Sequence, residues 1–320
     1  MSIDRSVGVG VEIGGGKTTV ALIDSQGRVC HRCQAKTLRG RPALATLDPY
    51  LRVIDAALAY AQAEGLPVRG IGVSIPGSLD VEARRPLQVP ILPALNSFPL
   101  KDLLETRYRL PAHLHVDVDA AMLGEQRFGA GRGFRRLLFL TVNAVVGASV
   151  VADGVLVHQP QYVGHICHVS VSASGPRCSC GKRGCINTLV SMDAVQKMVQ
   201  RALRRGDESR FTQRLLNHEY FSPQLLAEEA MRGDSVAAQI YSEVGRWLGA
   251  AIAKYINLFE PNLLILGGGV LPANELLLTH VRSSLTTSSS SAAQVCTMVE
   301  VVAADLGSDA ALIGATVPLF

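Results

Sequence analysis

The sequence predicts an α/β protein with two domains, and three observations support this prediction. The chain has 320 residues, whereas a single domain usually holds about 100–200. Hydrophobic residues make up 48% of the chain, which is enough to bury a core and excludes a disordered polypeptide. Short apolar runs of strand length alternate with longer stretches of helical spacing. We place the boundary near residue 118, between an N-terminal domain (1–118) and a C-terminal domain (119–320).

Apolar periodicity and turn residues predict the individual elements. In the first domain we expect strands at 7–13, 19–24 and 28–36, a helix at 43–64, a strand from 69, a helix at 99–107 and a strand at 113–117. In the second we expect a helix at 119–129, strands at 137–143 and 147–152, mainly helical residues over 189–260 around a polar loop at 206–223, and a strand at 262–266. The hairpin that opens each half is a weak internal repeat. The TTSSSS run at 286–291 predicts a surface loop.

Charge and hydropathy argue against a nucleic-acid-binding, membrane or secreted protein. The chain carries 31 Lys and Arg against 27 Asp and Glu, a net charge of +4, which is too small and too scattered to indicate nucleic acid or a membrane surface as a partner. No apolar run reaches the length of a membrane span, and the N-terminus lacks the pattern of a secretory signal. We therefore expect a soluble, cytoplasmic protein.

Three of the seven cysteines lie within eight residues, at 178, 180 and 185. Together with His168 they offer three thiols and one imidazole, the donor set of a tetrahedral structural zinc site. Such a closed site would hold a loop in place and would not activate water. The alternative is a group of free thiols in a reducing compartment. Cys30 and Cys33 have the spacing of a metal or redox knuckle, but no second pair follows them, so we interpret that spacing as coincidence.

Two glycine clusters follow expected strands. The opening GVEIGGGKTTVALID places Gly14, Gly15 and Gly16 at a hairpin turn, where glycine permits positive φ and close approach of backbone N–H groups to a phosphate, with Lys17 adding a cation. The segment NLFEPNLLILGGGV ends a buried strand in Gly267–Gly269, where α/β proteins place ligands. Turns made only for packing are the alternative in both places.

Asp117 and Asp119 lie where a strand ends and a helix begins. A carboxylate there could accept a proton from a substrate hydroxyl. The ordinary role of such an aspartate is to cap the helix, and Asp119 is better placed for it.

Taken together, these motifs resemble the ROK family (repressors, open reading frames and sugar kinases), within the actin-like ATPase and hexokinase fold. The resemblance covers nearly the whole chain: the glycines at 12–17, SIPGSLD at 74–80, ILPALNSFPLKDLLE at 91–105, DVDAAMLGEQRFGAGRG at 117–133, the His168 and cysteine set, EPNLLILGGGV at 260–270 and DLGSDAALIGA at 305–315. It implies two ribonuclease-H-like domains around a central cleft, with the last helix packed on the N-terminal domain, and a homodimer.

The resemblance implies ATP-dependent phosphorylation of a hexose or amino sugar, with Mg²⁺ on the phosphates and structural Zn²⁺. Asp117 would be the base, acting on the sugar hydroxyl. The implied nucleotide residues are Glu12, Gly14, Gly15, Gly16, Lys17, Gly147, Gly267 and Gly268. The implied sugar contacts are Gly77, Asp117, His165 and Asn187, and the implied metal ligands are His168, Cys178, Cys180 and Cys185.

The chain departs from the family pattern at both phosphate motifs and at the sugar contacts. Glu12 replaces an Asp and Gly16 a Thr, and the second phosphate motif, usually Gly-Thr-Gly-x-Gly, reads NAVVG at 143–147. In the sugar motifs Val116 replaces an Asn, Cys167 replaces a Gly, and His165 and Asn187 each replace a Glu. Each lost hydrogen-bond partner costs about 1–3 kcal/mol of sugar binding, so we do not expect an ordinary glucokinase.

Two hypotheses follow from the resemblance and the departures. The first is a divergent sugar kinase of weak activity or altered specificity, with Asp117 as base. The second is a catalytically inactive sugar sensor or scaffold that keeps the fold and the metal. ROK repressors bind DNA through an additional N-terminal helix-turn-helix, and here the phosphate loop begins within the first 17 residues, so we expect no direct DNA binding.

Overall fold

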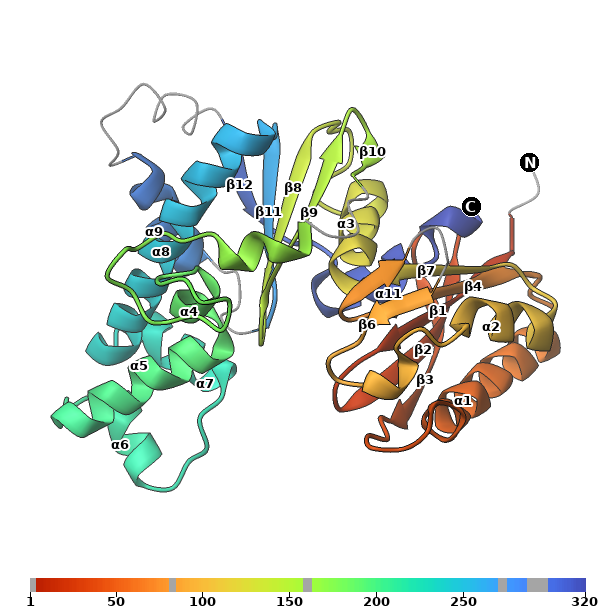
Figure 1. The fold of residues 1–320 in the computed structure, drawn as a ribbon, viewed down its shortest axis with the longest axis horizontal. Coiled ribbons are helices and arrows are strands. Elements are labelled where there is room, and N and C mark those ends of the chain that lie inside the picture. Colours follow the sequence, from red (N-terminus) through yellow and green to blue (C-terminus); the bar gives the residue numbers. More distant parts are fainter. Residues whose placement is uncertain (1–3, 81–84, 158–162, 270–274, 287–298) are drawn as a thin grey trace. The chain divides into compact units, whose positions relative to one another are not determined.

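The chain forms two compact units in a computed structural model, which describes residues 4–80, 85–157, 163–269, 275–286 and 299–320 (Figure 1). The side chains of residues 163–165 and 286 are outside this description. Unit 1 comprises residues 1–133, 158–164 and 305–320, and unit 2 comprises residues 134–157 and 165–304. The chain therefore enters unit 2 after residue 133 and returns to unit 1 for its last sixteen residues.

Unit 1 contains a five-stranded sheet in the order β3-β2-β1-β4-β7. Its strands are β1 (Val7–Ile13), β2 (Lys17–Asp24), β3 (Val29–Lys36), β4 (Val68–Ile75) and β7 (Ala112–Val116). The first three strands are antiparallel neighbours, whereas β4 runs parallel to β1 and β7 runs parallel to β4. A short ribbon of β5 (Ser78–Asp80) and β6 (Arg85–Gln88) follows β4.

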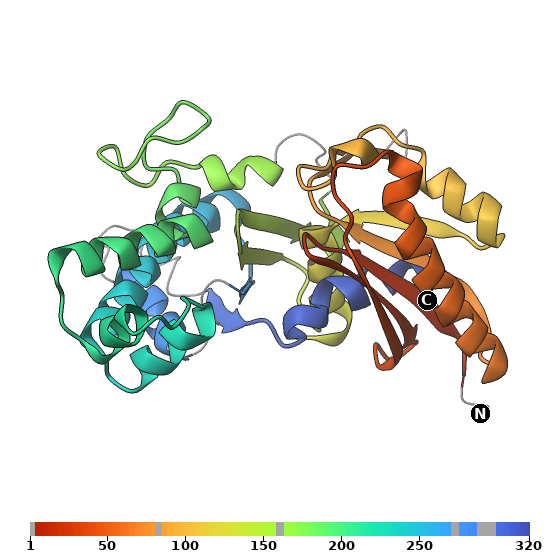
Figure 2. The same ribbon diagram turned by 90° about the horizontal axis from the view of Figure 1, so that it is seen from below.

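The sheet is buried on both faces at β2. Successive side chains of a strand point to opposite faces, and here Val20 and Leu22 join the core that includes α1 (Ala43–Ala63), while Ala21 and Ile23 pack with Leu312 and Ile313 of α11 (Ala310–Gly314). The continuous apolar run of β2 is thus the pattern of a strand covered on two sides. Figure 2 shows α1 and α11 on opposite sides of the strands.

Unit 2 repeats the same topology with a second five-stranded sheet, in the order β10-β9-β8-β11-β12. Its strands are β8 (Leu137–Val142), β9 (Val146–Ala152), β10 (Val155–Leu156), β11 (Leu263–Gly267) and β12 (Glu300–Ala303). The antiparallel neighbours are again the first three strands, and β11 and β12 are again parallel to β8. The weak internal repeat in the sequence is therefore a repeat of the whole sheet.

Helices form most of the remainder. Unit 1 adds η1 (Pro93–Leu95), α2 (Leu100–Tyr108), α3 (Asp117–Phe128), η3 (Gly307–Asp309) and η4 (Val317–Leu319). Unit 2 adds α4 (Asn187–Val190), α5 (Met192–Arg205), α6 (Arg210–Leu216), α7 (Pro223–Met231), α8 (Ser235–Phe259) and α9 (Glu275–Thr286), while η2 spans Val163–His168. In the core of unit 2, α8 lies against α9 closely enough that a Cβ on Gly249 would lie 2.5 Å from the Ser284 Cβ.

The polar segment at 206–223 is only partly a loop, so the sequence-based prediction was wrong there. It contains α6, which begins at a reciprocal cap: the Ser209 side chain accepts the Thr212 N–H, and the Thr212 hydroxyl accepts the Ser209 N–H. Polar residues in such a cap stabilise a helix start that apolar periodicity does not reveal. Most of the 286–291 run lies outside the described residues.

The returning segment is bound to α3 through a buried carboxylate and small residues. Glu125 of α3 is fully buried and accepts the backbone N–H groups of Ala130 (2.9 Å), Asp305 (3.2 Å) and Leu306 (2.8 Å). Beyond these contacts, α11 lies directly on α3, and a Cβ on Gly314 would overlap the carbonyl oxygen of Ala120. Only glycine permits this separation of the two backbones. Among the described residues, no helix combines the length and apolarity needed to cross a bilayer.

We predict that Gly314→Ala destabilises the protein by about 1–3 kcal/mol, because the added methyl group forces α11 away from α3. Denaturant unfolding monitored by circular dichroism measures this change. Gly16→Ala is the matched control, since a Cβ there has no neighbour within 4 Å, and its free energy of unfolding should stay within about 0.5 kcal/mol of the wild type. Equal stability of the two variants would contradict the packing described here.

Candidate active site and metal centre

Three of the predicted site residues lie at one edge of the unit 1 sheet. The parallel strands β1, β4 and β7 end together, since Glu12 pairs in register with Ser74, and Ser74 with His115. Glu12 is near the end of β1, Gly77 follows β4 and Asp117 follows β7. This edge, at the carboxyl ends of parallel strands, is where α/β proteins place ligands.

Asp117 is the first residue of α3, and its Oδ1 accepts the N–H of Val118 at 2.8 Å. The helix therefore starts two residues before Asp119, and the expectation that Asp119 caps it was wrong. The Asp117 carboxyl keeps access to solvent, yet protein atoms surround it closely enough that desolvation raises its pKa to about 6, with a smaller contribution from the charge of Asp119. A carboxyl with this pKa can accept and release a proton near neutral pH.

Asp117 belongs to a cluster of charges in unit 1. Burial, followed by the charges of Asp117 and Asp309, raises the pKa of Glu12, while Lys17 and Arg32 oppose that change. The Arg32 guanidinium forms an ion pair with Asp309 at 2.6 Å. Carboxylates that raise one another's pKa are stabilised by a divalent cation. Asp309 and Arg32 were missed by the sequence analysis because they come from distant segments, η3 and β3.

The first glycine loop is a tight turn whose backbone groups have partners within the chain. Gly14 donates its N–H to the carbonyl oxygen of Lys17 at 3.0 Å, and Thr37 donates its hydroxyl to the Gly14 carbonyl at 2.8 Å. Arg39 donates through Nε at 3.1 Å and through Nη2 to the Gly15 carbonyl. None of the three glycines has a positive φ, so that part of the expectation was wrong. Close approach does require glycine at 14, where a Cβ would lie 2.6 Å from the Lys17 oxygen.

Position 77 requires glycine for two reasons. Its φ is +117°, and a Cβ would overlap the carbonyl oxygen of Gln88 on β6. The backbone thus turns sharply between β4 and the β5–β6 ribbon, next to the edge that carries Glu12 and Asp117.

The corresponding edge of the unit 2 sheet carries the other predicted glycines. Gly267 ends β11 and pairs in register with Thr141 of β8, which also pairs with Gly147 of β9. Gly268 has a φ of +112°, and its position against the backbone of Val142 leaves no room for a Cβ. The structure therefore brings Gly147, Gly267 and Gly268 together around the loop that joins β8 to β9.

Two asparagines hold this β8–β9 loop (143–145). The Asn143 Oδ1 accepts the N–H of Gly269 at 2.8 Å, and the Asn187 Oδ1 accepts the N–H of Val146 at 2.9 Å. The family resemblance implied a sugar contact for Asn187, and in the structure its Oδ1 is bonded to this backbone N–H. His165, the other replaced sugar residue, lies in η2, and its side chain is outside the described part of the chain.

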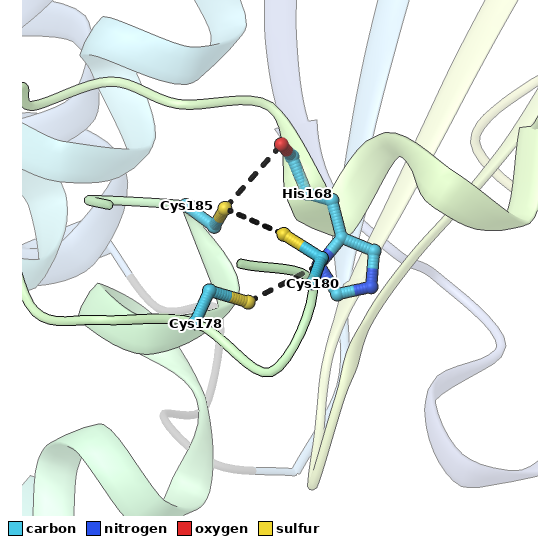
Figure 3. A group of neighbouring side chains, drawn as sticks. All are labelled: His168, Cys178, Cys180 and Cys185. Atoms are coloured by element: carbon cyan, nitrogen blue, oxygen red, sulfur yellow. Dashed lines mark hydrogen bonds between the residues drawn. The ribbon is translucent and has the colours of Figure 1, made fainter. Parts of the chain in front are cut away.

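The four predicted metal ligands lie together in unit 2 (Figure 3). One donor atom from each of His168, Cys178, Cys180 and Cys185 lies within 4.8 Å of the other three. The Cys178 Sγ is 3.3 Å from the His168 Nδ1, and the Cys180 Sγ is 3.6 Å from the Cys185 Sγ. Tetrahedral Zn²⁺ with ordinary bond lengths separates such donors by about 3.5–3.8 Å, so this donor set fits a zinc ion.

Glycine turns shape the loop that carries these ligands. The Cys178 N–H donates to the Lys182 carbonyl at 2.8 Å, and the Cys178 carbonyl accepts the N–H of Gly181, whose φ is +89°, at 3.0 Å. Gly184, with a φ of +60°, lies against Ser172 with no space for a Cβ. Cys167 is buried beside the cluster but outside it, while Cys30 and Cys33 lie on β3. Cys296 is outside the described residues.

Comparison with known proteins agrees with this duplicated fold, which is that of actin- and hexokinase-like proteins. A model of the ROK family matches residues 8–318. The chain therefore belongs to the ROK family.

Relatives of the chain include both enzymes and regulators. A glucokinase of Thermotoga maritima is 31% identical over 96% of this chain and 95% of its own length. The DNA-binding transcriptional repressor Mlc of Escherichia coli is 28% identical over 86% of this chain and 66% of its own length. A solved structure of a ROK glucokinase from Streptomyces griseus, in complex with glucose and AMPPNP, superposes with a TM-score of 0.76 at 30% identity, covering 97% of this chain and 98% of that one.

The raised pKa of Asp117 predicts a pH-dependent cost to stability. Because the folded protein holds this proton more tightly than the unfolded chain, ionised Asp117 destabilises the fold above pH 6, and the cost disappears as pH falls from about 6 toward 4. We expect Asp117→Asn to raise the melting temperature at pH 8, by a margin that shrinks below pH 6. Asp48→Asn on the exposed side of α1 is the control. A margin independent of pH would contradict the desolvation of Asp117.

Proposed function

We propose that the protein catalyses ATP-dependent phosphoryl transfer to a hydroxyl of a hexose or amino sugar, with Asp117 as the base. The observation that supports this most directly is Asp117 itself, a carboxyl with a pKa of about 6 at the carboxyl edge of three parallel strands, beside Glu12. The glucokinases of T. maritima and S. griseus are relatives at 31% and 30% identity.

In the proposed reaction Asp117 accepts the proton of the sugar hydroxyl. The hydroxyl oxygen forms a bond to the γ-phosphorus of ATP while the bond from that phosphorus to the bridging oxygen of ADP breaks. The base must be ionised before transfer, which a pKa of about 6 ensures at neutral pH. The proton then leaves Asp117 to solvent, and the products are a sugar phosphate and ADP.

The other charges of unit 1 would stabilise the phosphates. Mg²⁺, when bound, neutralises phosphate charge, and Glu12 would help to hold it, directly or through water. Lys17 is exposed at the start of β2 and would supply a cation. Arg39, on the Gly15 carbonyl, adds a second cation where the family's threonine hydroxyl is replaced by Gly16. These residues orient the donor and compensate its charge.

The Cys₃His cluster would hold Zn²⁺ in a structural role. Four protein donors fill a tetrahedral shell, so the metal has no open position for catalysis. His168 and Cys185 connect the end of η2 to the segment that begins α4, which carries Asn187. The metal would thus hold the segment 168–185, which follows His165 and precedes Asn187. Asn187 in turn contacts the β8–β9 loop.

The sugar would make different contacts from those of a family substrate, because His165 and Asn187 replace the two glutamates of the family's sugar motifs. The family's second glutamate is Asn187, and its oxygen is engaged by Val146. A pocket that loses such acceptors discriminates against sugars that need them. We therefore propose that the preferred sugar is not bound through position 187.

A second candidate function is a sugar sensor that binds without turnover. The observation in its favour is the β8–β9 loop, where Asn143, Ala144 and Val145 stand in place of the family's Gly-Thr-Gly and Val145 is 55% exposed without a polar group. The relatives that act as DNA-binding regulators share this fold with the enzymes. Hexose binding without ADP production at saturating ATP would favour the sensor.

The kinase proposal predicts that Asp117→Asn lowers turnover by at least about 100-fold, since general-base catalysis contributes about 10²–10⁴-fold. A coupled assay for ADP, run over a panel of hexoses and N-acetylated amino sugars, measures this. Asp48→Asn controls for the loss of one surface carboxylate. Turnover by Asp117→Asn at the wild-type rate would remove Asp117 from the base role.

The metal proposal predicts one Zn²⁺ per chain, lost in Cys185→Ser with a lower melting temperature, as expected when a structural site is emptied. Elemental analysis measures the metal, and Cys33→Ser on β3 is the matched control that should retain it. Chelators should remove the ion, because His168, Cys180 and Lys182 line an open surface pocket. Full zinc content in Cys185→Ser would contradict the proposed ligand set.

A further inference from the structure

Three backbone donors in and next to the β8–β9 loop of unit 2 are already occupied. Val146 donates its N–H to the Asn187 Oδ1 at 2.9 Å, and Gly269 donates to the Asn143 Oδ1 at 2.8 Å. The N–H of Asn143 itself bonds the Val145 carbonyl at 3.3 Å. Three main-chain N–H groups next to Gly147, Gly267 and Gly268 therefore bond to oxygens of the chain itself.

The orientation of the Asn143 amide is fixed at both ends. Its Nδ2 donates to the Thr141 hydroxyl at 2.8 Å, which directs Oδ1 toward the N–H of Gly269. Its backbone carbonyl accepts the N–H of Met192 at 3.1 Å, at the start of α5. The side-chain oxygen, the side-chain nitrogen and the backbone carbonyl of Asn143 all have partners. The side chain is therefore held in one orientation.

Asn187 makes the second connection from the other side of the loop. It is half-buried at the first position of α4, two residues after the metal ligand Cys185. Ile186 next to it is fully buried and bonds to the backbone of Val169, so the start of α4 is held in place. The amide oxygen that reaches Val146 is therefore presented by an ordered segment.

Phosphate oxygens bind to backbone N–H groups at loops of this kind. An amide oxygen that already accepts such an N–H competes with the phosphate for the same donor. Glycine at position 143 would have no side-chain oxygen to accept the N–H of Gly269. A residue at position 187 whose side chain points away from the loop would likewise leave the N–H of Val146 free. The competition is thus a property of these two asparagines.

We infer that Asn143 and Asn187 close the β8–β9 loop and set the affinity of the protein for the polyphosphate of a nucleotide. This inference rests on the proposed function, with the nucleotide phosphates at the second phosphate motif (143–147) that the family resemblance implies. A nucleoside diphosphate or triphosphate must displace the two amide oxygens to reach Val146 and Gly269. Removing either side chain frees one N–H and strengthens nucleotide binding.

Calorimetric titration with Mg–ADP tests the inference on the full-length protein. One hydrogen bond that no longer has to be displaced should tighten binding by about 3- to 10-fold in Asn143→Ala and in Asn187→Ala. Asn217→Ala, at an exposed amide that follows α6, is the matched control and should bind as the wild type does. Asn143→Gly repeats the test at the same position if alanine disturbs the turn.

Amide hydrogen exchange in the ligand-free protein supplies a readout that does not depend on nucleotide. Exchange should become faster at Gly269 in Asn143→Ala and at Val146 in Asn187→Ala, each without change at the other site. Unchanged exchange, or equal Mg–ADP affinity in wild type and variants, would overturn the inference and leave the proposed function standing. Failure of every protein to bind millimolar Mg–ADP would overturn both.

Discussion

The structure depends on a single requirement: backbone N–H groups that leave the sheets and helices must find acceptors. In this chain side-chain oxygens supply many of them. Glu125 accepts three N–H groups and so holds the returning segment on α3, while Asn143 and Asn187 accept the N–H groups around the β8–β9 loop. Buried Glu125 would destabilise the fold if it lacked such donors, so its three hydrogen bonds hold the returning segment in one position.

The duplicated topology explains where the candidate site residues lie. Both sheets have an antiparallel hairpin followed by two parallel strands, so both present strand ends and a hairpin turn at the same edge. Unit 1 uses that edge for charge: Glu12, Asp117 and Lys17. Unit 2 uses it for glycine turns and two amides. One architecture thus presents a group of charged side chains in the first copy and glycine turns held by two amides in the second, with different side chains at equivalent places.

Much of the fold and of the metal cluster could be predicted from the sequence, because local rules determine both. Strand alternation, hairpin turns and the spacing of three cysteines are short-range patterns, and β2, the β9–β10 turn and Cys178–Cys185 follow them. Other features depend on contacts between distant segments. Nothing near Asn187 indicates that its oxygen faces Val146, 41 residues away, and nothing near Asp309 indicates Arg32. The helix at Arg210–Leu216 was missed because polar caps, not apolar spacing, define its start.

We propose a ROK protein in which Asp117 serves as the base of a sugar kinase while the amides of Asn143 and Asn187 occupy the loop that would receive the nucleotide. Such a site can retain chemistry while binding ATP weakly. Phosphorus NMR of the wild-type protein mixed with Mg–ATP at high millimolar concentration and a hexose panel tests this account most directly. We expect a slowly growing sugar-phosphate resonance that matches the loss of the γ-phosphate signal. ATP that stays intact with every sugar, or that yields only inorganic phosphate, would contradict it.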